Sequence, residues 1–381
     1  MTLRISSNFD SGAIEVLSLA RADDIRLRIR ADQGIHGDAA FRQWFHFRLH
    51  GAAGQPVRLV FENAAEAAYP DGWPDYRCVA SYDRRNWFRI RGTRYENGQL
   101  IVEHTPERNS IYYAYFEPYS HERHLDLLGR VEMSPFASVS NLGATVEGRD
   151  LDLVTVGRPG PGKAPVWIIA RQHPGESMAE WFVEGLLERL LDGADPVARR
   201  IREKAVLYIV PNMNPDGAIR GNLRTNAAGA NLNREWREPS PDTSPEVLLV
   251  RDAMEASGVA LFLDIHGDEA LPYVFFSTAE EVPGFTPTQQ VRQARFVDSL
   301  LGASPDLQTE QGYQTGRFRD ELLTLASKWV AHRFGCVSLT LEMPFKDNAN
   351  LPDGLVGWNG ERSKRLGEAM LNPILGHLLD R

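Results

Sequence analysis

Two histidines follow directly on apolar segments of the sequence, at positions where a side chain could bind a metal ion. His173 comes shortly after the segment APVWIIA (164–170), and Glu176 lies three residues further on. His266 follows a second apolar segment, VALFLDI (259–265). Catalytic zinc takes three protein ligands and keeps one open position, and two histidines with one glutamate are a standard ligand set. The pattern therefore predicts a zinc site made of His173, Glu176 and His266.

Each of these residues also has a purely structural interpretation. Glu176 precedes a predicted helix, where an acid complements the helix dipole. Either histidine could close a strand by bonding to a backbone carbonyl. The three residue types together favour the metal site over three independent structural roles. Asp264 and Asp268 flank His266 and are candidates for orienting it, or simply solvated loop acids.

A fourth acid closes the last long apolar segment, CVSLTLE (336–342). A carboxylate buried beside a cleft needs a partner or a function. Hydrolysis at a zinc site requires a base that removes a proton from water and later delivers it to the leaving amine. Glu342 is the predicted base, and the alternative is an ordinary carboxylate at a strand end.

The elements around these residues predict an α/β fold with a mixed sheet. Apolar runs at 164–170, 205–211, 259–265 and 336–342 alternate with helical patterns. Ligands in such folds bind beyond the carboxyl ends of the strands. The helix expected after Glu176 places a set of large apolar side chains on one face: Met178, Trp181, Phe182, Leu186 and Leu190.

The first third of the chain has a different character. Short alternating segments separated by Gly, Asp and Asn predict an antiparallel β-sandwich of about 115 residues. Its aromatic residues could line a ligand-binding face, although aromatic residues in strands more often belong to the core; they are Trp44, Trp73, Trp87, Tyr112 and Tyr113.

Composition excludes several classes of protein. With 42 basic and 51 acidic residues, the net charge of −9 disfavours a broad nucleic-acid surface. The N-terminal segment lacks the apolar stretch of a secretory signal, and no apolar run of 18 residues occurs. Two cysteines in unrelated contexts, Cys78 and Cys336, favour thiols in a reducing compartment. We therefore expect a cytoplasmic enzyme that binds neither membranes nor nucleic acid.

Five motifs in order resemble the zinc carboxypeptidases of the carboxypeptidase A type, most of all the cytosolic carboxypeptidase branch: HPGES, PNMNPDG, NLRTNAAGANLNREW, DIHGDE and TLEMPF. The resemblance covers residues 118–381, and a β-sandwich ahead of the catalytic domain is similar to the arrangement in that branch. It implies a sandwich domain at 1–117, a catalytic domain at 118–381 with a mixed sheet of mostly eight strands, and one zinc ion per chain.

The resemblance also implies a role for each matching residue. Zinc ligands fall on His173, Glu176 and His266, and the general base falls on Glu342. The pair that holds the C-terminal carboxylate of a peptide falls on Asn233 and Arg234, and the arginine that stabilises the oxyanion falls on Arg224. A planar guanidinium suits both tasks.

This sequence departs from the family pattern in two places. The acid that commonly braces the first histidine ligand is replaced by Asn231, so His173 must be oriented by a neutral carbonyl or another group. The tyrosine that closes over substrate in digestive relatives has no certain match; Tyr313 is a candidate, and a loop tyrosine is the alternative. Arg317 and Lys328 lie where the specificity pocket is usually built and could favour an acidic C-terminal residue.

The expected function is hydrolysis of the C-terminal residue of peptides or proteins by promoted-water attack, with glutamate as the suggested residue removed. One alternative keeps the fold and changes the substrate: a zinc amidohydrolase or deacylase acting on small N-acyl amino acids. The other alternative is a binding protein with a silent catalytic domain. Retention of all three ligands and of Glu342 argues against the second.

Overall fold

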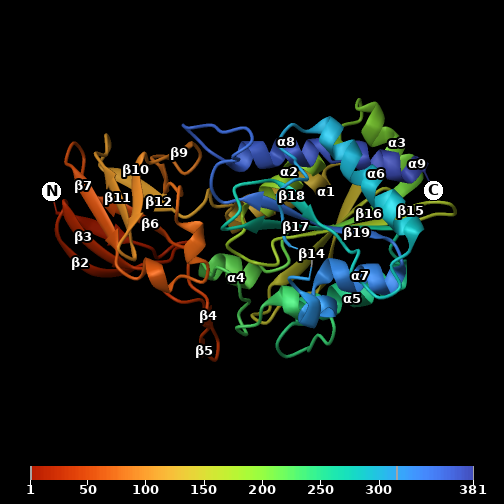
Figure 1. Cartoon of the computed structure of the whole chain (residues 1–381), viewed down its shortest axis with the longest axis horizontal. Coiled ribbons are helices and arrows are strands. Elements are labelled where there is room, and N and C mark those ends of the chain that lie inside the picture. Colours follow the sequence, from red (N-terminus) through yellow and green to blue (C-terminus); the bar gives the residue numbers. More distant parts are fainter. Residues whose placement is uncertain (1, 315, 381) are drawn as a thin grey trace.

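The structure, a computed structural model, describes residues 2–314 and 316–380. Two parts lie side by side along the long axis (Figure 1). The N-terminal part, drawn in red and orange, consists mainly of β-strands. The C-terminal part places helices on both faces of one sheet. The predicted fold class, β-sheets followed by an α/β unit, is confirmed.

Two five-stranded sheets pack face to face in the N-terminal part, in the orders β1-β6-β12-β8-β9 and β10-β11-β7-β3-β2. Phe47 and Phe61, from opposite sheets, lie with their ring centroids 6.2 Å apart. Among the strands described in these two sheets, every pairing is antiparallel except that of β3 with β7. The strands are β1 (Arg4–Ser6), β2 (Glu15–Arg21), β3 (Asp24–Arg28), β6 (His46–His50), β7 (Val57–Phe61), β8 (Val79–Ser81), β9 (Trp87–Arg89), β10 (Gly92–Glu96), β11 (Gln99–His104) and β12 (Ser110–Ala114), with a separate hairpin β4 (Gln33–Gly34) and β5 (Gly37–Asp38).

The aromatic residues of this part mostly fill its core. Trp44, Trp73 and Tyr113 are at most 2% exposed, whereas Trp87 and Tyr112 are half-buried. The expectation that strand aromatics are core residues therefore holds for three of the five.

The C-terminal sheet has the order β13-β14-β16-β15-β17-β19-β18, with a parallel centre and antiparallel edges. Its strands are β13 (Ala137–Ala144), β14 (Asp150–Val156), β15 (Ala164–Ala170), β16 (Ala205–Val210), β17 (Leu261–Asp268), β18 (Phe275–Ser277) and β19 (Val337–Pro344). The described residues supply seven strands where the resemblance implied mostly eight. Next to β18, Val274 and Leu307 form a single parallel bridge, which is too short to count as a strand.

Helices cover both faces of this sheet (Figure 1). They are α1 (His121–Glu132), α2 (Met178–Leu190), α3 (Pro196–Lys204), α4 (Pro215–Arg220), α5 (Pro245–Ser257), α6 (Pro287–Ala303), α7 (Ala326–Phe334), α8 (Gly360–Ala369) and α9 (Leu371–Leu379). The sequence predicted one apolar face for α2, but nearly the whole helix is buried, because α8 packs against its other side. Of the helices that the structure describes, none combines the length and apolar character needed to cross a bilayer.

Arg89 of β9 joins the two parts. Its guanidinium is buried and donates to the carbonyl oxygens of Phe345 and Trp358, both at 2.8 Å. Tyr115 stacks on Phe345 with 4.7 Å between ring centroids. These contacts pack the two parts against each other. The predicted boundary at residue 117 falls between β12 and α1 and stays a prediction.

Two glycines allow α2 and α8 to approach closely. A Cβ atom on Gly367 would lie 2.0 Å from the carbonyl oxygen of Phe182, and one on Gly185 would lie 2.1 Å from that of Lys364. This contact fixes α2, which begins two residues after Glu176.

We therefore expect Gly367→Ala to destabilise the protein by about 2 kcal/mol or more, because overpacking against backbone outweighs the better helix propensity of alanine. Gly129→Ala is the control. Gly129 lies on the exposed side of α1, and a Cβ atom there would meet only open space. Alanine at this position should stabilise by about 0.5–1 kcal/mol. Thermal unfolding measures both, and a Gly367→Ala protein with an unchanged Tm would contradict the close-packing argument.

Candidate active site

The candidate site lies where the parallel strands β15, β17 and β19 end. His266 on β17 pairs directly with Glu342 on β19. His173 and Glu176 come from the turn between β15 and α2. The sequence alone placed these four residues at strand ends, and the structure brings all four to one cleft of about 370 Å³.

An unusual turn presents His173 and Glu176. Arg171 has a left-handed backbone (φ 57°), a conformation that non-glycine residues rarely adopt. Its buried guanidinium donates to the carbonyl oxygen of Pro174 at 2.9 Å and to Glu180 of α2 at 2.7 Å. These bonds tie the turn to the helix behind it, so the two candidate ligands have a rigid support.

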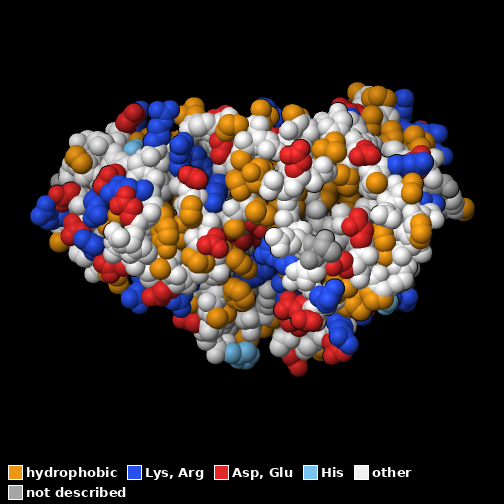
Figure 2. All heavy atoms as spheres, in the orientation of Figure 1, with side chains coloured by type: hydrophobic (Ala, Val, Ile, Leu, Met, Phe, Trp, Pro, Cys, Tyr) orange, Lys and Arg blue, Asp and Glu red, His pale blue; other side chains and the backbone are white. Residues whose placement is uncertain are grey.

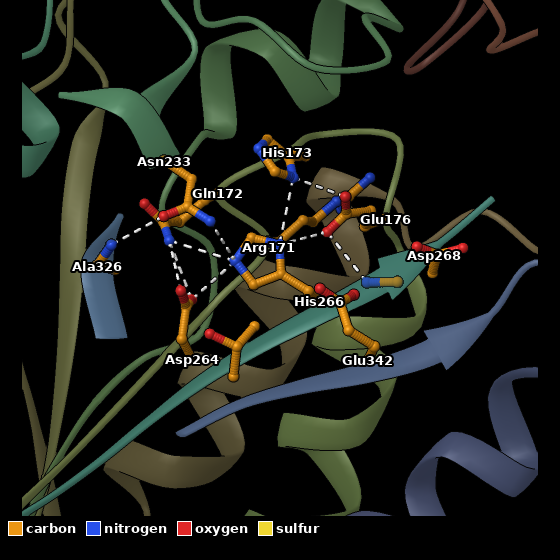
Figure 3. Close-up of polar contacts among 12 residues, drawn as sticks. Arg171, Gln172, His173, Glu176, Asn233, Asp264, His266, Asp268, Ala326 and Glu342 are labelled. Carbon is orange, nitrogen blue, oxygen red and sulfur yellow. Dashed lines mark hydrogen bonds and ion pairs between the residues drawn. The ribbon is translucent and has the colours of Figure 1, made fainter. Parts of the chain in front are cut away.

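His173, Glu176 and His266 form a compact, buried group (Figure 3). The two carboxylate oxygens of Glu176 lie 2.6 Å from His173 Nδ1 and 2.8 Å from His266 Nδ1. The two Nδ1 atoms are 3.2 Å apart. Burial, and then the charge of Arg224, lower the pKa of His173 to about 3, so its imidazole is neutral and can act as a metal ligand.

Each histidine is oriented through its other ring nitrogen. Nε2 of His266 lies 3.0 Å from Asp264, and Nε2 of His173 lies 3.0 Å from the amide oxygen of Asn231. Gln172 donates to both oxygens of Asp264, at 3.0 and 2.9 Å. The group that orients His173 is therefore the neutral amide oxygen of Asn231, as expected from the replacement of the family's acid by asparagine.

Glu342 lies beside this group and keeps one oxygen uncommitted. Its Oε1 accepts a hydrogen bond of 3.0 Å from the hydroxyl of Tyr313, while its buried Oε2 has no partner among the described residues. Burial, and then the nearby carboxylates of Glu176 and Asp268, raise the pKa of Glu342 to about 8, against the opposing effect of His266. A carboxylate with this pKa is suited to exchange a proton near neutrality.

Tyr313 thus lies over the cleft rather than in a remote loop. Its hydroxyl oxygen also lies 2.7 Å from Asp268 Oδ2, so Asp268 and Glu342 share the single proton of this hydroxyl. Arg317 stacks on its ring, with the guanidinium carbon 4.1 Å from the ring centroid. Asp268 therefore contacts Tyr313 and not His266, so only Asp264 of the two flanking acids orients the histidine.

Three more candidates line the same cleft: Arg224, Asn233 and Arg234. Asn233 accepts a hydrogen bond of 2.9 Å from the backbone amide at the start of α7, which fixes its side chain. Arg234 pairs with the half-exposed Glu321 at 2.5 Å.

Across the face shown in Figure 2, basic and acidic side chains are interspersed, with basic ones gathered near the middle.

Lys328 supplies a buried positive charge on the α7 side of the cleft. It is 4% exposed, contacts the carbonyl oxygen of Thr278, and donates to Ser277 Oγ at 3.2 Å. Burial lowers its pKa to about 8, although nearby acids, Glu281 foremost, act in the opposite direction. Ser327 and Thr340 line the cleft beside it and bond to each other at 2.7 Å.

Several residues of the site carry no recognisable pattern in the sequence. Tyr69 and Asp71, from the N-terminal part, line the cleft. Gln172, whose side chain accepts from Trp236 at 2.7 Å, supports Asp264. Their neighbours lie far away in sequence, so only tertiary structure identifies them.

Comparison with known families follows the division seen in the structure. Residues 126–356 match the model of the family described as zinc carboxypeptidase, and residues 5–116 match that of the cytosolic carboxypeptidase N-terminal domain. The chain belongs to the zinc carboxypeptidase family. It is accordingly a peptidase, and the predicted family is confirmed.

Several solved and curated proteins are similar to this chain. A metallo-carboxypeptidase from Burkholderia cenocepacia is 57% identical, with a TM-score of 0.96 over 100% of both chains. One from Pseudomonas aeruginosa, solved with (2-guanidinoethylmercapto)succinic acid, is 44% identical, with a TM-score of 0.94 over 99% of both. An uncharacterized protein of Zymomonas mobilis is 45% identical over 100% of this chain and 98% of its own length. Cytosolic carboxypeptidase 6 of Mus musculus is 28% identical, over 71% of this chain and 54% of its own length.

The contact between Asn231 and His173 leads to a prediction about metal affinity. A carboxylate at this position would make the His173 ring a stronger ligand, and such supporting groups change affinity by about 10–100-fold. We expect Asn231→Asp to bind zinc at least about 10-fold more tightly and Asn231→Leu to bind it more weakly, in competition with a chelator. Equal affinities for all three proteins would show that Asn231 does not orient the ligand.

Proposed function

We propose that this carboxypeptidase-family protein hydrolyses the last peptide bond of peptides or proteins, using one zinc ion held by His173, Glu176 and His266. The observation that supports this most is the uncommitted, buried oxygen of Glu342 beside the His-Glu-His group. The cleft is also lined by Arg224, Arg234 and Arg317. Together with Glu342 and the His-Glu-His group, these residues supply the parts needed to activate water and to recognise a carboxylate.

The donor set fits zinc. Two nitrogens bound to one tetrahedral zinc at the usual bond length lie about 3.3 Å apart, and the two Nδ1 atoms here are 3.2 Å apart. When bound, zinc would lower the pKa of a water molecule and polarise the carbonyl of the substrate.

The residues of the chain divide the remaining work. Arg234 and Asn233 bind the C-terminal carboxylate of the substrate. This carboxylate replaces Glu321 as the ion-pair partner of the Arg234 guanidinium. Oε2 of Glu342 accepts a proton from water while the oxygen of that water attacks the carbonyl carbon of the substrate. Arg224 stabilises the negative charge on the carbonyl oxygen. Glu342 then delivers the proton to the amine nitrogen as the C–N bond breaks, while Tyr313 keeps the carboxyl group oriented.

We further propose a preference for an acidic C-terminal residue, with glutamate as the leading candidate. Lys328 is buried beside Ser277, Ser327 and Thr340. Together they form a small polar pocket whose positive charge suits an anionic side chain. The P. aeruginosa relative was solved with a succinic acid derivative that also carries a guanidino group. Peptides that end in a basic residue are therefore included in the test.

The cytosolic relatives support a cytoplasmic location for this protein.

The central test combines Glu342→Gln with a peptide panel. Because general acid–base catalysis contributes about 10²–10⁴-fold, we expect the variant to retain zinc and to lose at least about 100-fold in kcat. The panel contains peptides ending in Glu, Asp, Lys, Phe or Ala, together with N-acyl amino acids. Zinc is measured by elemental analysis and product by release of the terminal residue. A wild-type protein that cleaves only the N-acyl amino acids would refute the peptidase assignment for this chain.

The Lys328 pocket predicts a pH-dependent preference. Below its pKa of about 8 Lys328 is charged, so peptides ending in Glu should be favoured over those ending in Gln, and this ratio of kcat/KM should fall as the pH rises through 8. Lys328→Met should lower kcat/KM for Glu-ending peptides about 10-fold or more and leave Ala-ending peptides unchanged. Arg317→Met is the matched control. If Arg317→Met alone abolishes the preference, the anion binds at Arg317 instead.

A further inference from the structure

The loop that carries Arg224 is held by a carboxylate from the N-terminal part. Asp32 is 3% exposed. Its Oδ1 accepts from the backbone amide of Leu223 at 2.6 Å, and its Oδ2 accepts from those of Arg224 at 2.8 Å and Thr225 at 2.9 Å. The hydroxyl of Thr225 adds a fourth bond at 3.1 Å. Three consecutive amides thus converge on one side chain, and without it they would be buried donors lacking an acceptor.

The hairpin β4–β5, which follows Asp32, extends this contact (Figure 1). The amide of Gln33 donates to the Asn222 side chain at 2.8 Å, and that side chain donates back to the carbonyl of Gln33 at 3.1 Å. The amide of Ile35 donates to the carbonyl oxygen of Ala227 at 2.7 Å. The hairpin therefore clamps the Arg224 loop on both sides of the arginine.

The guanidinium of Arg224 also depends on the N-terminal part. Among the described residues it makes no side-chain hydrogen bond or ion pair. The carboxyl groups of Glu269 and Glu176 attract it only through space and do not fix its direction. Its carbon lies 5.3 Å from the ring centroid of Tyr69 and 5.8 Å from that of Phe41. Both rings come from the N-terminal part and present their faces to the cation.

We infer that Asp32 is a positioning residue for Arg224, and that the N-terminal part is a component of the catalytic site because it holds this arginine at both its backbone and its side chain. The inference rests on the proposed role of Arg224. The chemical reason is geometric: an arginine that stabilises a developing oxyanion must be held close to its working position, since a misplacement of about 1 Å can cost about 100-fold in rate. The hydrogen-bonded carboxylate supplies that restraint at a distance from the substrate.

The test is a double-mutant cycle in the full-length chain. Asp32→Asn keeps the shape of the side chain but replaces one acceptor by a donor that faces amide donors. We expect kcat to fall about 10–100-fold, with KM and zinc content within about twofold of wild type. Arg224→Gln alone should lower kcat about 10²–10³-fold. In the Arg224→Gln background, Asp32→Asn should cause less than about a twofold further loss, because its effect passes through the arginine.

The outcomes separate this inference from the proposed function. If Arg224→Gln leaves kcat unchanged, the proposed role of Arg224 fails and the inference fails with it. If Arg224→Gln lowers kcat but Asp32→Asn causes the same loss in both backgrounds, or loses zinc, only the inference is overturned, and Asp32 serves general folding.

Two further variants keep the test decisive. Asp38→Asn changes an exposed acid of the same hairpin and should leave kcat unchanged. Phe41→Leu removes a ring beside Arg224 but keeps the hydrogen bonds from the Arg224 loop to Asp32. If Asp32→Asn does not fold, the same double-mutant cycle is run with Phe41→Leu. A loss of kcat in Phe41→Leu that disappears in the Arg224→Gln background supports the inference, and an equal loss in both overturns it.

Discussion

Glu176 places one carboxylate oxygen against each of two histidine rings in a region that solvent barely reaches. A buried carboxylate is tolerated only where positive charge and hydrogen bonds compensate it. The architecture of the C-terminal part meets this requirement: parallel register brings the ends of β15 and β17 together, and a left-handed turn at Arg171 brings His173 back toward the sheet. The packing of α2 against α8 then keeps the helix behind Glu176 from moving.

The two histidines differ in what stands behind them. His266 lies against the carboxyl group of Asp264, which together with Glu176 overcomes burial and raises the pKa of His266 well above its usual value. His173 is backed by the neutral amide of Asn231, and burial lowers its pKa. The two histidine rings thus experience two different electrostatic environments within one group. Two residues account for the difference: Asn231 stands where His266 has an acid, and the charge of Arg224 lowers the pKa of His173 further. Asn231 is the residue that the sequence already marked as a departure from the family pattern.

Much of the site was predictable because its residues follow strands with strong apolar signals. The segment APVWIIA forms β15 from its first residue to its last, and the candidate ligands come shortly after it. The N-terminal sheets were predicted as a class, but the parallel pairing of β3 with β7 was not, because alternation does not report strand direction. The edge strands β13 and β18, and β14 next to β13, lacked a strong apolar signal. Asp32 lies in a polar stretch that resembles any surface loop, and its burial results from a partner 191 residues away.

Arg89 imposes an order on synthesis. Its carbonyl partner at Phe345 lies 256 residues further along the chain, and a ribosome that adds about 5–20 residues per second needs roughly 13–50 s to reach it. For most of that interval all the strands of the N-terminal sheets have been synthesised, while this guanidinium has only its partner within the N-terminal part, the carbonyl oxygen of Arg77. The contact between the two parts at Arg89 forms only after β19 has emerged. The two parts therefore reach their final relative arrangement near the end of translation, long after the N-terminal part has been synthesised.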